Sequence, residues 1–93
     1  MYDLTAFQRD LLYVICGLDR PHGLLVKEEL ESYYDGEINH GRLYPNLDTL
    51  VEKGLVDKGQ QDRRTNYYQL TRRGQRELDA RREWETSLGS TEG

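Results

Sequence analysis

The sequence has little cysteine and proline, and it has no long run of apolar residues. It holds one Cys, two Pro and one Trp among 93 residues. A single cysteine excludes a disulfide framework within the chain. The apolar runs fall short of the roughly 18–20 residues of a membrane span, and the first residues lack the features of a signal peptide. We therefore expect a cytoplasmic protein.

Motifs for catalysis, cofactors and metals are also missing. The chain has no glycine-rich phosphate loop, paired-carboxylate motif or nucleophile elbow, so we expect neither an enzyme nor a cofactor. Cys16, His22 and His40 do not have the spacing of a zinc site, and we expect no metal. Cys16 fits a small apolar core residue better than a redox sensor.

The charge is unevenly distributed along the chain. The net charge is −4, yet 10 of the 13 basic side chains fall within residues 40–82, where they outnumber the acidic ones. The flanking segments 1–39 and 83–93 are acidic. Because a local basic patch sets the binding field better than the total charge does, the middle of the chain is a candidate for nucleic-acid binding.

Apolar periodicity predicts four helices, at about residues 5–18, 24–34, 41–53 and 71–87. Thr5 and Gln8 fit a capping box at the start of the first helix, and His22 is expected to help start the second. The first helix is apolar on more than one side. It is therefore either a central core helix or one that is shared between the core and a partner subunit.

The third predicted helix organises the rest of the chain. Leu43, Leu47 and Leu50 form one apolar face, and polar residues occupy the other. Gly54 stands at the expected C′ position. Pro45 is expected in the first turn, where a missing backbone N–H costs little.

Two short strands are predicted between the third and fourth helices. Residues 55–60 and 66–71 read as strands, and the polar turn 61–65 carries Arg63 and Arg64 at its tip. The fold class is therefore mainly α with a small β-hairpin, in the order α-α-α-β-β-α.

This arrangement resembles the PadR-like winged helix-turn-helix transcriptional regulators, in a short form. The motifs that carry the resemblance are His22-Gly23, Gly41-Arg42-Leu43-Tyr44-Pro45, Glu52-Lys53-Gly54-Leu55-Val56, Asn66-Tyr67-Tyr68-Gln69-Leu70-Thr71 and Gly74. The chain departs from the family pattern at Arg42, where Thr is usual, and at the wing tip, which lacks the common Gly-Pro pair. Ten Arg against three Lys in an acidic chain suggest a halophilic, haloarchaeal or high-GC source.

The resemblance implies a homodimer that binds double-stranded promoter DNA, in most members as a repressor. Some members release DNA when a small, often aromatic, effector binds, but the short C-terminal part argues against an elaborate ligand-binding domain. The implied division is a DNA-binding domain over 1–70, a dimerisation helix over 71–88 and a flexible tail over 89–93.

The expected DNA-binding surface combines the recognition helix, residues 41–53, with the wing turn, residues 61–65. Arg, Asn and Thr read base edges, and a helix that carries them fits the major groove. Tyr44 either donates to a phosphate or packs below the helix, and the wing suits the backbone or the minor groove. The alternative for each position is a solvated face. The expected DNA contacts are Arg42, Tyr44, Asn46, Thr49, Lys53, Arg63 and Arg64.

The fourth helix carries an apolar stripe at intervals of four residues, formed by Ala80, Trp84 and Leu88. An exposed Trp–Leu stripe usually marks an interface, so we expect a dimer contact. Trp84 could instead join the monomer core or stack on an aromatic ligand. The alternative function for the whole chain is a winged-helix protein–protein interaction module without DNA binding. The basic residues on the third helix and the wing favour DNA.

Overall fold

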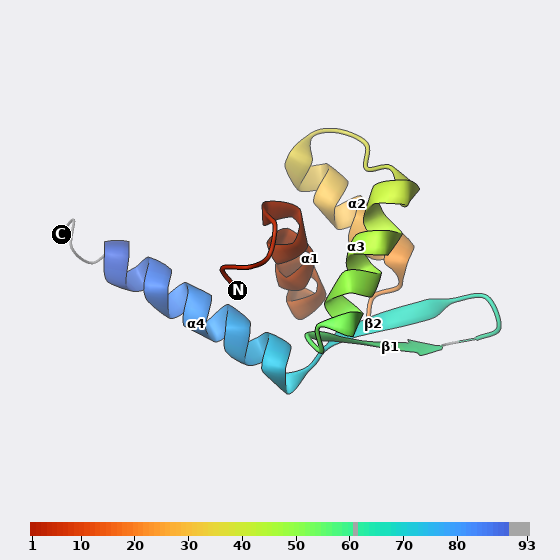
Figure 1. The fold of residues 1–93 in the computed structure, drawn as a ribbon. Helices are drawn as coiled ribbons and strands as arrows, with labels where there is room; N and C mark the ends of the chain where they lie inside the picture. Colours follow the sequence, from red (N-terminus) through yellow and green to blue (C-terminus); the bar gives the residue numbers. More distant parts are fainter. Residues whose placement is uncertain (61, 90–93) are drawn as a thin grey trace.

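The computed structural model describes residues 1–60 and 62–89. Its elements follow the predicted order and form a winged helix-turn-helix. They are α1 (Ala6–Gly17), α2 (Gly23–Tyr34), α3 (His40–Glu52), β1 (Val56–Gln60), β2 (Asn66–Leu70) and α4 (Arg72–Gly89) (Figure 1). None of the described helices is long and apolar enough to cross a membrane. Gly89, placed in the tail by the sequence, is the last residue of α4, and 90–93 lie outside the described residues.

Local sequence signals set most of the helix ends. The capping box of α1 is confirmed, because Thr5 Oγ1 accepts from the Gln8 backbone and Gln8 Oε1 accepts from the Thr5 backbone. His22 caps α2 through Nδ1, which accepts from a backbone N–H. Gly54 has φ 76°, the left-handed conformation that a helix C′ position favours. Thr71 caps α4 by accepting from the Gly74 backbone.

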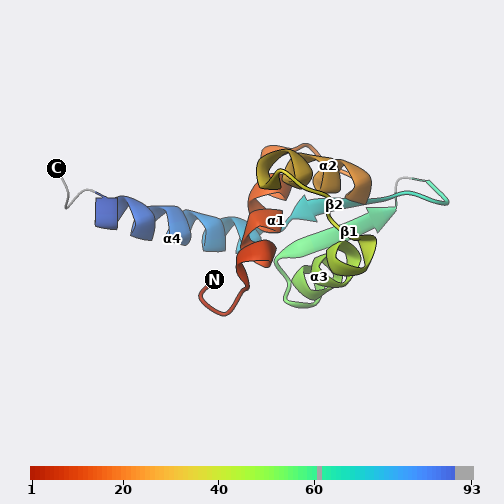
Figure 2. The same cartoon turned by 90° about the horizontal axis from the view of Figure 1, so that it is seen from above.

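The core lies between the first three helices, the hairpin and the first turns of α4. Its buried apolar residues are Leu4, Phe7, Leu11, Leu12, Ile15, Val26, Leu30, Ile38, Leu43, Leu47, Leu50, Leu55, Val56, Tyr68 and Leu78. The start of α4 is held close, since a Cβ at Gly74 would lie 2.2 Å from the backbone oxygen of Leu55. Beyond Leu78, residues 79–89 of α4 include no buried residue, and the helix projects from the body (Figures 1 and 2).

The wing is an antiparallel hairpin that pairs Val56 with Leu70 at one end and Gln60 with Asn66 at the other. It also pairs with the segment before α2, because the Tyr68 N–H donates to the Pro21 oxygen at 2.9 Å. The sequence predicted only a turn there. This short bridge fixes the base of the wing against the start of α2.

Candidate nucleic-acid interface

Helix α3 begins one residue earlier than predicted, at His40, because Asn39 caps it and accepts from the Gly41 N–H. Pro45 is therefore the sixth residue of the helix, beyond the four donors that lack helical partners. The expectation that Pro45 lies in the first turn is wrong. Because Pro45 has no backbone N–H, one intrahelical hydrogen bond is missing. The carbonyl that loses this bond belongs to Gly41, which is exposed.

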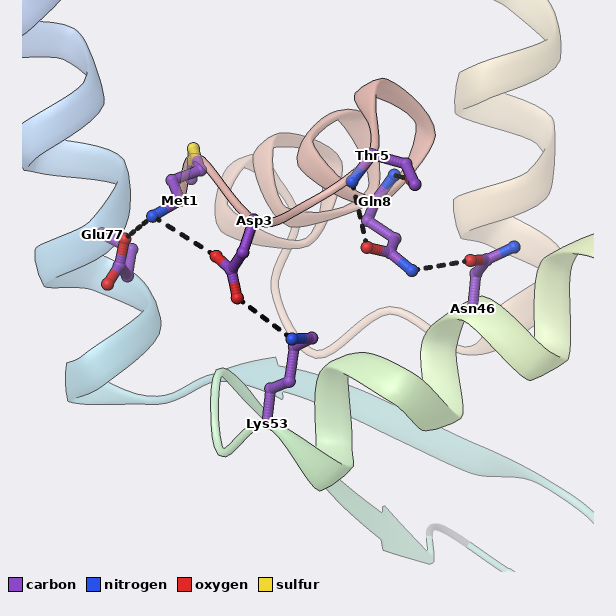
Figure 3. Close-up of polar contacts among 7 residues, drawn as sticks. All are labelled: Met1, Asp3, Thr5, Gln8, Asn46, Lys53 and Glu77. Atoms are coloured by element: carbon purple, nitrogen blue, oxygen red, sulfur yellow. Dashed lines mark hydrogen bonds and ion pairs between the residues drawn. The ribbon is translucent and has the colours of Figure 1, made fainter.

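Three of the expected DNA contacts, Arg42, Asn46 and Thr49, lie on the flank of α3 that faces α1. The Arg42 guanidinium lies 4.0 Å from the centre of the Phe7 ring. Asn46 Oδ1 accepts from Gln8 Nε2 at 3.0 Å (Figure 3), and Asn46 Nδ2 donates to the Arg42 carbonyl. The Thr49 hydroxyl donates to the Pro45 carbonyl at 3.0 Å. These side chains are thus partly occupied by contacts within the protein, and their DNA contacts stay a prediction.

Lys53 continues this flank one turn further. Its Nζ lies 3.1 Å from Asp3 Oδ2 in the segment before α1 (Figure 3). The hydrogen bond from Lys53 lowers the pKa of the Asp3 carboxyl. Both side chains are exposed enough that the pair contributes little stability, and a DNA phosphate can compete with Asp3 for the ammonium group.

Tyr44 lies on the opposite flank of α3 and packs against the start of α2. A Cβ added at Gly23 would come within 2.7 Å of the Tyr44 ring, so the contact requires glycine there. His40 meets the same ring edge-on, with 5.7 Å between the ring centroids. Packing against α2 is thus the role that the structure shows for Tyr44. A phosphate contact stays a prediction.

The outermost stripe of α3 consists of Gly41, Pro45, Asp48 and Glu52, all of which are exposed. It lies opposite the buried leucines, midway between the two flanks. Asp48 forms an ion pair across to the wing, with 3.6 Å between its Oδ1 and Nζ of Lys58 on β1. The sequence reasoning missed Asp48, although the helical spacing of Asp48 from Gly41 and Pro45 could have identified its face.

The wing tip carries both predicted arginines. Asp62 Oδ1 accepts from the backbone N–H groups of Arg64 and Thr65, at 2.8 and 2.9 Å, and these bonds lower the pKa of the Asp62 carboxyl. Arg63 and Arg64 are exposed. Gln61, also in the predicted wing turn, lies outside the described residues. The ordered turn presents two adjacent guanidinium groups to solvent.

A groove of about 490 Å³ separates the wing from α2 and α3. Tyr44 and Asp48 line it from α3, Lys58 and Arg64 line it from the hairpin, and His22 lines it from the start of α2. The groove therefore brings the recognition helix and two cations of the wing to one open surface. Such a surface fits a polyanionic backbone better than it fits a small neutral ligand.

The predicted dimer stripe lies on the projecting part of α4. Trp84 and Leu88 are each 52 % exposed, and Ala80 is exposed as well. The Arg81 guanidinium lies 4.7 Å from the centre of the Trp84 ring. Trp84 therefore does not join the core of this protomer. The dimer contact and the alternative ligand contact stay predictions.

Cys16 does not belong to a recognisable site. It is half-buried, and its thiol donates to Gln75 Oε1 at 3.7 Å. In residues 1–60 and 62–89, no group of three or more His, Cys, Asp or Glu side chains is arranged to hold a metal ion.

Comparison with known proteins identifies the family to which this geometry belongs. Residues 11–80 match the model of the transcriptional regulator PadR-like family. The chain belongs to the PadR-like family. This confirms the resemblance inferred from the α3 and wing motifs. The protein is a DNA-binding transcriptional regulator with a winged helix-turn-helix fold.

Solved structures support this assignment. The chain is 52 % identical to the protein RosR in a complex structure, with a TM-score of 0.91 and coverage of 94 % of this chain and 77 % of RosR. RosR of H. salinarum in another structure gives 52 % identity, a TM-score of 0.89 and coverage of 92 % and 77 %. A winged-helix DNA-binding protein from STIV shares the fold at 20 % identity, with a TM-score of 0.74 and coverage of 91 % and 92 %. A search of curated proteins gives no match.

Proposed function

We propose that this regulator binds promoter DNA as a homodimer, with α3 in the major groove and the wing on the backbone or in the minor groove. The observation that carries this proposal is the groove where α3 meets Lys58 and Arg64 of the hairpin. A surface of this shape receives the edge of a duplex on α3 and one phosphate strand beside it.

The cations that contact phosphates in this proposal come from both sides of α3. Arg63 and Arg64 lie on the wing side and are exposed. Lys53 lies on the α1 side, where the exposed Asp3 competes with phosphate for it. Arg42 lies on the same flank as Lys53 and is also exposed, although its guanidinium stacks over Phe7. The protein would thus contact the backbone on both edges of one major groove.

The dimer in this proposal forms through α4. Trp84 is exposed on a helix that projects from the core. In the proposed dimer, a second copy of the chain buries this side chain. Trp84 also lines a groove of about 510 Å³ with Tyr2 and Arg9, which provides a surface for the partner. Repression follows if the dimer covers promoter sequence that the polymerase needs. A small aromatic effector stays a prediction from the family alone.

The test is DNA binding by the wild type and by a variant in which Arg63 and Arg64 are both changed to Ala. The variant should bind every sequence more weakly, and its log–log salt slope should be less steep by about 1.8, because each neutralised phosphate contributes about −0.9. The matched control changes both residues to Lys and should keep most of the slope. If the wild type binds no promoter DNA at any salt concentration, a protein–protein module becomes the better description.

A further inference from the structure

The outermost stripe of α3 has few groups that can form hydrogen bonds with a base. Gly41 and Pro45 have no polar side-chain atoms, and both are exposed. They let a duplex approach the first half of the helix closely without reading it. The only polar side chains on this stripe are those of Asp48 and Glu52, so the stripe presents hydrogen-bond acceptors.

Asp48 is positioned for a contact outside the protein. Its side chain is 57 % exposed, and Oδ1 lies 3.6 Å from Lys58 Nζ. Within the described part of the chain, Oδ2 has no hydrogen-bond donor. The ammonium of Lys58 holds the carboxylate on the side of the wing groove, and its charge reduces the repulsion between Asp48 and the phosphates of a bound duplex.

The chemistry of a carboxylate restricts what it can read. An ionised carboxylate only accepts hydrogen bonds, and the donors in the major groove are N4 of cytosine and N6 of adenine. Adenine N6 lies between two acceptors, its own N7 and O4 of the paired thymine. Cytosine N4 has an acceptor on one side only, the guanine O6. A carboxylate is therefore repelled less at a cytosine.

We propose that Asp48 reads a cytosine in the major groove and is a specificity-determining residue of this regulator. The inference rests on the proposed placement of α3 in DNA. It adds the identity of one base in each half-site, and it assigns to Lys58 the role of positioning Asp48.

Glu52 provides a matched comparison on the same helix face. It is the last residue of α3, one turn beyond Asp48, and it forms no ion pair within 4.0 Å in the described residues. Changing Glu52 to Gln removes one negative charge from the same stripe, as changing Asp48 to Asn does. The two variants therefore have the same net charge and differ in which carboxylate is lost.

The experiment selects preferred sites from random DNA with the wild type, Asp48→Asn and Glu52→Gln. The wild type should select cytosine at one position of each half-site. Asp48→Asn should lose that preference by about 10-fold or more and move toward adenine, the base that an Asn side chain pairs with. Glu52→Gln should keep the cytosine and bind all sequences somewhat more tightly.

A second measurement does not depend on the folding of a variant. In the selected site, the cytosine is replaced by uracil opposite adenine, which exchanges the N4 donor for an O4 acceptor. Wild-type binding should fall by about 10-fold or more. If this exchange has no effect, or if Asp48→Asn keeps the wild-type preference and only tightens binding, the inference is overturned while DNA binding stands. A wild type that binds no DNA overturns the proposed function itself.

Discussion

The hydrogen bond between Gln8 and Asn46 joins α1 to the recognition helix, and a double-mutant cycle can measure it. Gln8 is 9 % exposed, and its Nε2 donates to Asn46 Oδ1 at 3.0 Å. The same Gln8 side chain completes the capping box of α1 through its other amide atom. Breaking this contact should therefore affect both the stability of the domain and the placement of α3.

The magnitudes follow from what each substitution removes. Asn46→Ala removes the bond to Gln8 and leaves the Gln8 amide unpaired with little access to water, which should cost about 1–2 kcal/mol. Gln8→Ala removes the same bond together with half of the capping box, and should also cost about 1–2 kcal/mol. Because both single variants lose the shared bond, the double variant should be less destabilised than the sum by about 1 kcal/mol.

Urea unfolding followed by circular dichroism at pH 7 gives the four free energies of the cycle. If the two changes add to within about 0.5 kcal/mol, the bond does not couple α1 to α3 and the reasoning is refuted. DNA binding separates two roles for Asn46. We expect Gln8→Ala to weaken binding without changing the preferred bases, whereas Asn46→Ala should also relax the preference at one base position. A change of one preferred base in Asn46→Ala alone would show that Asn46 reads DNA.

Two further predictions concern the dimer and the pH dependence of stability. Trp84→Ala should shift the protein from dimer toward monomer in sedimentation velocity. The control, Leu24→Ala, removes another exposed apolar side chain and should leave the dimer unchanged. If Trp84→Ala also leaves the dimer unchanged, Trp84 is not its anchor. Burial raises the pKa of Tyr68 to about 12 from an ordinary value of 10.0. The protonated phenol therefore stabilises the fold fully below pH 10, and this contribution of about 3 kcal/mol is lost as the pH rises through 12. Urea unfolding at pH 9 and pH 12 should show the loss, and Tyr68→Phe should reduce it.

Most of the fold could be predicted because its signals are local. The capping box at Thr5, the left-handed Gly54 and the cap at Thr71 each act within a few residues, and the apolar spacing of α3 identified its buried face. The pairing of Pro21 with Tyr68 could not be predicted in this way. It joins two segments that are far apart in the sequence. The segment around Pro21 has the composition of a turn, which does not indicate that it pairs with a strand.

The candidate site was less predictable than the fold, for a related reason. Helical spacing separates the buried leucines from the polar residues of α3, but it does not say which neighbour covers each flank. The structure places α1 beside Asn46 and α2 beside Tyr44. These contacts depend on where separate segments meet. Helical spacing could have placed Asp48 on one face with Gly41 and Pro45, but it could not show that this is the face left between two covered flanks.

In this arrangement, different parts of the molecule determine the affinity for DNA and the choice of bases. Contacts on both flanks fix the orientation of α3 but leave only a narrow stripe free, and that stripe carries two carboxylates. A helix with this face cannot supply the attraction for a polyanion. The attraction must come from cations beside this stripe, at Arg42 and Lys53 on the α1 flank and at the two arginines of the wing. The salt dependence of binding should therefore follow these cations, and the choice of bases should follow the α3 stripe. Variants of the two surfaces should thus affect affinity and specificity separately.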